Sequence, residues 1–406
     1  MRKLFCKASA ILLAIIISMA TFAPTFEASA YGMENDWLYE EVVDIDVPEA
    51  DGADKEAVLN AVENFTYENI YGLTTSGALS HGRIFGGRGT TFAIMPDGSL
   101  WGWGANAQGQ LGVGTNTANY PNPIFIMDDV ISVATDTWTS FAIRSDGSLY
   151  GWGANWWGNV GDGTTTHRTS PVRVLDNVVQ VSAGQEHTLA LRADGSVWAW
   201  GNNFAGMIGD GTTTRRLFPV RVNDLGNNVT YISAGIAHSM AIRSDGSLWG
   251  WGDNEWAQLG DGTTTRRLRP VRILNDVAAV SGSAAIRTDG SLWTWGWNHL
   301  GQVGDGTTIN RLRPVWIMNN VTSVVFRHDH GAALTADGNL WAWGISNISQ
   351  RGNLSRPVLV MNDVVEFAAG PGNATVIRSD GNVWRWGGNP FVNIGSPVLV
   401  IEDIIP

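Results

Sequence analysis

The chain has 406 residues and a formal net charge of −12, and it contains 49 Gly and 20 Trp. An acidic balance of this size opposes nonspecific binding to nucleic acid or to an anionic membrane, since both carry negative charge. Cys6 is the only cysteine, which excludes an intramolecular disulfide framework and a metal site built from several thiolates.

The first thirty residues have the pattern of a secretory signal peptide. Basic residues precede an apolar run at residues 10–20, and Ala28 to Ala30 supplies small residues at the cleavage position. The apolar run is too short for a stable membrane span. We therefore expect residues 1–30 to be a signal peptide cleaved after Ala30. The mature protein is then expected to be secreted, either free in the surroundings or associated with the cell surface, without insertion into the membrane.

Residues 31–81 differ from the rest of the chain. Residues 31–54 are acidic and contain no Lys or Arg, a composition typical of disordered segments. Within residues 55–70, Val58, Val62 and Phe65 recur at helical spacing, which predicts one helix. We expect an acidic arm and a helix docked on the main domain, residues 82–406. A separate functional module is the alternative.

One Trp- and Gly-rich motif recurs through the main domain. It consists of Asp-Gly, then Ser or Asn, Leu or Val, an aromatic residue, a variable residue and Trp-Gly, at intervals of 43–51 residues. A repeat of this length accommodates four short strands. The seven copies begin at Asp97, Asp146, Asp194, Asp245, Asp289, Asp337 and Asp380.

The third copy shows the expected strands most clearly, at residues 178–181, 188–191, 196–200 and 219–222. Asp-Gly between the second and third strands predicts a tight hairpin turn, because Gly accepts the positive φ that the turn requires. Pro219 is expected at the first residue of its strand, where a missing N–H is tolerated. Seven such sheets predict an all-β fold, a seven-bladed β-propeller of four-stranded antiparallel blades, which leaves only short, protected edges.

The two aromatic residues of each motif lie two positions apart and therefore project from the same face of the sheet. We expect them to pack between adjacent blades. Residues 83–87 match a first strand and residues 397–400 match a fourth strand, so the two ends of the domain are expected to be neighbours in a ring. The pattern leaves open whether the seam lies within a blade or between two blades.

Val-x-x-Val-Ser-Ala-Gly-x-x-His, followed by Asp-Gly-Ser-x-Trp-x-Trp-Gly-x-Asn and Gly-Asp-Gly-Thr-Thr-Thr, resembles the regulator of chromosome condensation repeat. The pattern is cleanest in residues 178–214 and 229–265, and it spans roughly residues 82–401. The resemblance implies a seven-bladed propeller, here in a bacterial exported form, and is weak for function. The chain is more distantly similar to the type II β-lactamase inhibitory protein, which implies β-lactamase inhibition as a minor alternative.

Strand direction predicts that the loop between the first and second strands shares a face with the loop after Trp-Gly. The copies differ most at this face, and binding sites on repeat scaffolds are usually made by such variable loops. Loop aromatics with a few charges suit a protein interface or stacking on sugars; alternatively, they pack on one another over the mouth of the propeller. The candidate binding residues are Trp138, Trp156, Trp157, Phe204, Glu255, Trp256, Trp297, His299 and Phe391.

Other polar residues recur at fixed repeat positions, which favours structural roles. His187, His238 and His330 share one position, and a side-chain hydrogen bond closing the loop is expected there. The aspartates of Gly-Asp-Gly have an arginine nearby in the chain, which indicates turn capping with a local ion pair. No catalytic residues, metal ligands or cofactor motif stand out.

We therefore expect a binding scaffold rather than an enzyme, with an extracellular or cell-surface protein as its partner. Binding of carbohydrate or cell-wall glycan through Trp156, Trp157 and Trp256 is the alternative from another class. Nucleotide exchange on a small GTPase, the best-known activity of the resembled family, is not expected. The predicted leader separates the protein from that partner, and the even repeat spacing leaves no room for a large inserted wedge.

Overall fold

The structure is a computed structural model of the chain. It describes residues 83–86, 89–117, 119–136, 138–326, 330–344, 354–369, 373–380, 382–387 and 398–401. The predicted signal peptide (1–30), the acidic arm (31–81) and its helix (55–70) lie outside the described residues. No helix within these ranges is long and apolar enough to cross a membrane.

The described residues form twenty-eight strands and one short 3₁₀ turn, η3 (Asn223–Leu225). In chain order, the first three sheets contain β1 (Arg83–Gly86), β2 (Thr90–Ile94), β3 (Leu100–Ala105), β4 (Asn119–Met127), β5 (Val130–Thr135), β6 (Thr139–Arg144), β7 (Leu149–Gly153), β8 (Arg168–Leu175), β9 (Val178–Ala183), β10 (His187–Arg192), β11 (Val197–Gly201) and β12 (Arg216–Arg221). The next two contain β13 (Val229–Ala234), β14 (His238–Arg243), β15 (Leu248–Gly252), β16 (Arg267–Leu274), β17 (Val277–Ser281), β18 (Ala284–Arg287), β19 (Leu292–Gly296) and β20 (Arg311–Met318). The last two contain β21 (Val321–Phe326), β22 (His330–Thr335), β23 (Leu340–Gly344), β24 (Leu354–Met361), β25 (Val364–Ala369), β26 (Asn373–Arg378), β27 (Val383–Gly387) and β28 (Val398–Ile401).

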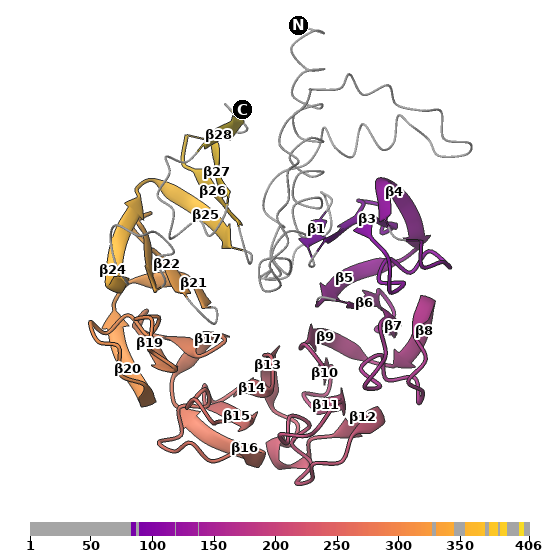
Figure 1. Ribbon diagram of the computed structural model, residues 1–406, viewed down its shortest axis with the longest axis horizontal. Helices are drawn as coiled ribbons and strands as arrows, with labels where there is room; N and C mark the ends of the chain where they lie inside the picture. The colour runs from indigo at the N-terminus through magenta and orange to yellow at the C-terminus, as the bar shows by residue number, and fades with distance from the viewer. Residues whose placement is uncertain are drawn as a thin grey trace, which may run out of the picture.

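These strands form seven four-stranded sheets, and each sheet contains four consecutive strands in chain order. All neighbouring pairs are antiparallel, as in β10 with β11. Figure 1 shows the sheets arranged around a common centre, with first strands such as β9 and β13 inside and fourth strands such as β12 and β16 at the rim. The predicted seven-bladed propeller is confirmed. Because every blade is continuous in sequence, the seam falls between β1–β4 and β25–β28 and not within a blade.

The Asp-Gly pairs form the hairpins between second and third strands. In the third blade Leu191 pairs with Val197 across the turn, and Gly195 has φ +77°. A Cβ on Gly195 would also collide with the carbonyl oxygen of Asn227, so both conformation and space require glycine.

The fourth strand begins earlier than the sequence pattern indicates. β12 starts at Arg216, which places Pro219 inside the strand and not at its first residue. β12 pairs only with β11 and forms the outer edge of its sheet. A residue without an N–H is tolerated there because the outward side of an edge strand has no ladder to complete.

The hydrophobic core lies between adjacent blades. Trp200 of the third blade is buried with Phe141, Ile143 and Leu149 of the second, and Trp198 packs against the same cluster while remaining partly exposed. The predicted packing of the paired aromatics between blades is confirmed, but the two positions differ. The second aromatic is fully buried in the second to fifth blades, whereas the first is half-buried near the hairpin, where Arg192 stacks on Trp198 with 4.8 Å from guanidinium carbon to ring centroid.

The buried indole also donates a hydrogen bond across the blade boundary. Its acceptor is a backbone oxygen in the loop between the third and fourth strands of the preceding blade, so each such loop lies against the next blade. In the first blade Trp103 is buried as well, and the loop that would precede it in the ring, residues 388–397, lies outside the described residues. The bonds are Trp152 to Gln110, Trp200 to Asn159, Trp251 to Met207, Trp295 to Gln258 and Trp343 to Gln302, at 2.7–2.9 Å.

Candidate functional site

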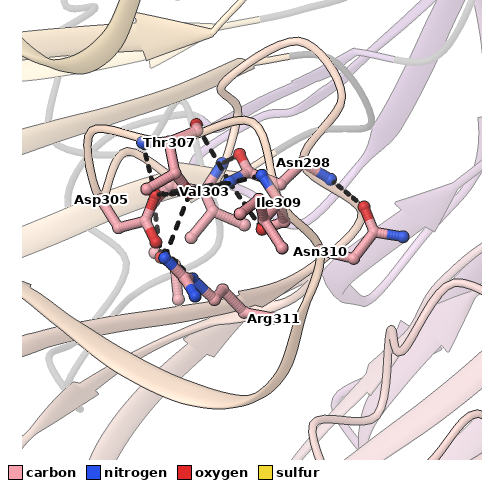
Figure 2. A network of polar contacts seen from close by, with 8 residues as sticks. Asn298, Val303, Asp305, Thr307, Ile309, Asn310 and Arg311 are labelled. Atoms are coloured by element: carbon pink, nitrogen blue, oxygen red, sulfur yellow. Dashed lines mark hydrogen bonds and ion pairs between the residues drawn. The ribbon is translucent and has the colours of Figure 1, made fainter.

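A buried asparagine shapes the variable loop that follows Trp-Gly in each of the first five blades, where the structure describes this loop. In the fifth blade Asn298 is inaccessible to solvent. Its Oδ1 accepts the N–H of Val303 at 2.9 Å, and its Nδ2 donates to the backbone oxygens of Thr307 and Ile309 at 3.1 and 3.0 Å (Figure 2). One amide therefore satisfies three backbone groups. These bonds fix the base of the loop from the inside, and the residues at the tip of the loop are free to vary in sequence.

The Gly-Asp-Gly segment closes the far end of the same loop. Asp305 accepts the N–H of Thr307 at 2.9 Å and forms an ion pair with Arg311 (Figure 2). Burial opposes ionisation of Asp305, but the hydrogen bonds from Thr307 and Arg311 outweigh it and hold the pKa of the carboxyl below its usual value. The predicted turn capping with a local ion pair is confirmed, and Asp162, Asp210 and Asp261 form the same pair with the arginine six residues ahead.

Backbone hydrogen bonds tie the two kinds of variable loop together. In the second blade the N–H of Ala154 donates to the oxygen of Trp138 at 2.9 Å, and in the third blade Asn202 donates to Glu186 at 2.9 Å. Ala154 and Asn202 begin the loops after Trp-Gly, whereas Trp138 and Glu186 lie between first and second strands. The predicted sorting of loops onto one face is therefore confirmed by direct contact. We call the surface formed by these two kinds of loop in the second to fifth blades the aromatic loop face.

The second blade contributes three exposed indoles to this face. Trp138, Trp156 and Trp157 are 40%, 47% and 41% exposed. His167, at the far end of the same loop, meets Trp156 edge to face with ring centroids 4.7 Å apart. The Nη1 of Arg215, from the loop of the third blade, lies 3.5 Å from the backbone oxygen of Trp156 and so connects the two loops.

The loops of the third and fourth blades meet through an arginine. Phe204 is half exposed, and the guanidinium carbon of Arg266 lies 5.9 Å from its ring centroid. The Nε of Arg266 also lies 3.3 Å from Asp253 in its own loop. A guanidinium held by a carboxylate on one side and an aromatic ring on the other is restrained in position.

The loops of the fourth and fifth blades form a three-ring cluster. Trp256 lies 6.2 Å from Trp297 and 6.4 Å from His299, and Trp297 lies 5.8 Å from His299, all between centroids. Trp256 and His299 are exposed, Trp297 is half-buried, and Glu255 is exposed beside the cluster. These tilted and edge-to-face contacts fix the ring orientations.

The backbone beside this cluster is strained. Ala257 has φ +62°, whereas the corresponding positions in the other four loops that the structure describes are glycines, Gly109, Gly158, Gly206 and Gly301, with φ between +76° and +83°. A Cβ in the left-handed region costs about 1–2 kcal/mol. The neighbouring Trp256 N–H donates to Oε1 of Gln258 at 2.8 Å, and Nε2 of Gln258 donates to Asp253 at 2.9 Å, so the strained residue lies in a hydrogen-bonded frame.

Eight of the nine predicted site residues therefore lie on one face, across four consecutive blades, whereas Phe391 lies outside the described residues. The sequence reasoning missed His167, Arg215 and Arg266, which connect the aromatic residues. All three occupy the position immediately before the arginine of the Gly-Asp-Gly ion pair, where Asn310 stands in the fifth blade. Variation at this one repeat position was the signal that would have identified them.

Of the histidines that share one repeat position, His187 has another role than the expected one. His187 does not close its own loop; its Nε2 lies 2.9 Å from the Oγ of Ser239 in the next blade. Ser239 donates its hydroxyl to the oxygen of Met207, so the imidazole is the donor to Ser239 and Nδ1 carries no proton. Burial, together with the nearby His238, lowers the pKa of His187 to about 3. His238 is half-buried, and burial lowers its pKa to about 4.

Within the described ranges, no group of three or more His, Cys, Asp or Glu residues is placed to hold a metal ion. The aromatic loop face instead offers exposed rings, guanidinium groups and carboxylates in fixed positions. These are the groups of a recognition surface: aromatic and arginine side chains are enriched among the residues that dominate protein interfaces.

Matches to individual proteins in sequence are short. The ultraviolet-B receptor UVR8 of Arabidopsis thaliana is 42% identical over 45 residues, which cover 11% of this chain and 10% of UVR8. The human E3 ubiquitin-protein ligase HERC2 is 33% identical over 48 residues, 12% of this chain and 1% of HERC2. The matched segments thus span a tenth or less of these curated relatives.

Solved structures match over most of the chain. Human WBSCR16 has a TM-score of 0.62 at 24% identity, covering 72% of this chain and 86% of that one. Prp20p from Saccharomyces cerevisiae has a TM-score of 0.58 at 22% identity, covering 69% and 78%. At these identities the likeness shows the fold. The family model of the RCC1-like domain matches residues 71–356, more than half of the chain, and the protein belongs to the RCC1-like domain family.

Proposed function

We propose that this protein is an exported binding scaffold whose aromatic loop face docks a protein partner. The observation that carries the proposal is that the neighbouring loops of four consecutive blades contact one another in turn, through Arg215, Arg266 and Trp256. Exposed aromatics interleaved with arginine, on a rigid scaffold, lose little conformational freedom when a partner binds. Export is supported by the signal-peptide pattern of residues 1–30.

The family supports the same kind of function. RCC1-like propellers are a protein-interaction kind of fold, and the structure of Prp20p is reported together with the binding of that protein to Gsp1p and histones. The partner of the present chain is a separate matter, because fold alone does not determine the ligand. An extracellular or cell-surface protein is the partner consistent with the predicted leader.

The test compares native protein with a Trp156→Ala/Trp157→Ala/Trp256→Ala variant in affinity capture from the surface and surroundings of the producing cells. Phe125 and Phe218 are exposed aromatics on outer strands, so Phe125→Ala/Phe218→Ala is the matched control. We expect native protein and control to retain one protein partner, and the triple variant to lose it by at least about tenfold, since hot-spot residues contribute about 2 kcal/mol or more each.

Equal capture by all three proteins would contradict a role for the aromatic loop face. Parallel incubation with a glycan array and with peptidoglycan separates the two classes of ligand. Binding to a glycan that is lost in the triple variant, without a captured protein, would replace the protein partner by a carbohydrate.

A further inference from the structure

The outer flank of the fifth and sixth blades exposes apolar side chains. On β20, Leu312 and Trp316 are 43% and 53% exposed, and on β24, Val358 and Leu359 are 41% and 44% exposed. β20 and β24 are the rim strands of consecutive blades and neighbour one another in Figure 1. Larger exposed apolar patches on a monomer mark interaction sites, and these residues belong to the rim strands and not to the aromatic loops.

Each of these two strands also carries an exposed arginine. Arg313 on β20 and Arg356 on β24 occupy the same strand position and are exposed. Each guanidinium packs over a glycine of the preceding blade, where a Cβ on Gly262 or Gly306 would lie 2.5–2.6 Å from its nitrogens. In the described part of the chain neither has a carboxylate within ion-pair distance, whereas their counterpart Arg269 pairs with Asp224 at 3.0 Å.

Only the fifth and sixth blades have both an arginine at the position of Arg313 and an apolar residue at the position of Trp316. The positions of Trp316 and Leu359 pair across the sheet with Trp293 and Trp341, and the corresponding positions in the second to fourth blades are arginines. We call five residues of the fifth and sixth blades the outer flank patch: Leu312, Arg313, Trp316, Arg356 and Leu359. Val358 pairs with Ala342 and lies on the opposite face of its sheet from Leu359, so it is not included. In the second to fourth blades, the arginines that stand at the position of Trp316 and Leu359 are Arg173, Arg221 and Arg272.

A segment of this chain outside the described residues has the complementary composition. Residues 31–54 contain nine acidic residues and no basic one. Within them, residues 36–47 combine acidic side chains with Trp37, Leu38 and Tyr39, and Val43 to Val47 alternates apolar and acidic residues. In an extended chain this alternation places the apolar side chains on one side. We propose that residues 36–47 dock on the outer flank patch of the same molecule.

The connection is long enough for this contact. Thirty-five residues, 48–82, separate the segment from Arg83. Even with residues 55–70 helical at about 1.5 Å per residue and the rest extended at about 3.3 Å, the connection reaches about 80 Å. The first blade is separated from the sixth only by the seventh around the ring. Pro314 and Pro357 lack the N–H groups that strand addition at this edge requires, so the contact forms through side chains.

The test measures distances between spin labels in the full-length chain. Cys6, the only cysteine, is replaced by serine, and labels are attached at Ala50→Cys in the acidic arm and at Thr308→Cys beside β20. Thr213, the exposed equivalent of Thr308 in the third blade, gives the matched pair Ala50→Cys/Thr213→Cys. We expect a short, narrow distance distribution to position 308 and a longer one to position 213.

Charge reversal identifies the contact. Arg313→Glu/Arg356→Glu is expected to reduce the short-distance population by about tenfold, because attraction becomes repulsion at two positions. The matched reversal Arg221→Glu/Arg272→Glu, on the third and fourth blades, is expected to leave it unchanged. Far-ultraviolet circular dichroism checks that both variants are folded. If Arg313→Glu/Arg356→Glu does not fold, Arg313→Gln/Arg356→Gln replaces it.

Three outcomes would overturn the proposal. The first is the same broad distribution to both propeller positions, and the second is a short distance that survives reversal of Arg313 and Arg356. The third is a short distance that disappears on dilution with unlabelled chain, because it would assign the contact to the arm of a second copy. The outer flank patch and the aromatic loop face share no residue, so these outcomes are read separately from partner capture by the Trp156, Trp157 and Trp256 variant.

Discussion

The indole N–H of Trp200 in the third blade donates to the backbone oxygen of Asn159 in the second blade, at 2.9 Å. The Oγ1 of Thr188 donates to the same oxygen at 2.9 Å. A loop of one blade is thus held by two side chains of the next. The same loop carries Trp156 and Trp157 at its tip, so the bond that joins the blades also positions the recognition surface.

Trp200→Phe removes this hydrogen bond and part of the buried ring. We expect it to lower the free energy of unfolding by about 1–3 kcal/mol, towards the lower end because Thr188 keeps the carbonyl of Asn159 paired. Trp200→Ala is expected to cost about 3–5 kcal/mol. Urea unfolding provides the measurement. Trp198→Phe is the control, since its indole bonds Ser196 within its own turn and is half-buried; a loss as large as that of Trp200→Phe would argue against the inter-blade role.

Folding stability is expected to fall between pH 6.5 and pH 4.5, partly through His187. Because burial lowers the pKa of His187 in the folded protein to about 3, the unfolded chain takes up a proton in this range and the folded protein does not. Stability is therefore complete above the unfolded pKa, near 6.5, and decreases as pH falls, by up to about 1.4 kcal/mol per pH unit for one group.

The measurement is urea unfolding of native protein and His187→Gln at pH 4.5, 5.5 and 6.5. The variant is expected to be less stable at pH 6.5 and to show a shallower slope. A slope unchanged by the substitution would mean that other groups, such as His238, account for the pH dependence.

Asn298→Asp removes the amide donor that binds the oxygens of Thr307 and Ile309 and places a carboxyl group in a buried position. We expect a loss of about 2–4 kcal/mol in the free energy of unfolding, since two buried acceptors lose their partner. Asn310→Ala removes only the acceptor for the N–H of Asn298, a bond of 2.9 Å at a half-buried residue. It is expected to cost about 1 kcal/mol. Equal losses in thermal or urea unfolding would show that the buried amide does not organise the loop.

Ala257→Gly tests the strained turn beside Trp256. Because Ala257 has φ +62°, glycine is expected to raise the free energy of unfolding by about 0.5–1 kcal/mol, after its larger unfolded-state entropy is taken into account. The opposite substitution, Gly158→Ala, adds a Cβ that collides with the side chain of Leu217 and is expected to destabilise by about 1–3 kcal/mol. If both changes shift stability in the same direction, the strain at Ala257 is not the controlling factor.

Much of the fold follows from local patterns. Asp-Gly between two apolar runs specifies a hairpin from its own chemistry, as at Asp194, and the interval between copies fixes the number of strands in each unit. The alternation of strand direction then decides which loops share a face, which the bond from Ala154 to Trp138 confirms. The start of β12 at Arg216, three residues before Pro219, was missed because the signal of an edge strand is weak.

Only part of the candidate site could be predicted from such local patterns. Trp156, Phe204 and Trp256 are visible as variable aromatics in equivalent loops, but nothing in their spacing shows that Arg266 stacks on Phe204 across a blade boundary. His187 illustrates the same limit. Its repeat position indicated a structural hydrogen bond, whereas its partner, Ser239, belongs to the next blade.

By itself the sequence determined the repeated unit: four strands, a glycine turn, a pair of aromatic rings and a variable loop, because each depends on residues close together in the chain. Only the tertiary structure decided how the units meet. It placed the loop of Asn159 on Trp200 and the ring seam between two blades, and it brought Arg266 onto Phe204 of the neighbouring blade. These relationships join residues about forty or more positions apart, and their geometry depends on how neighbouring sheets pack, which no local pattern encodes.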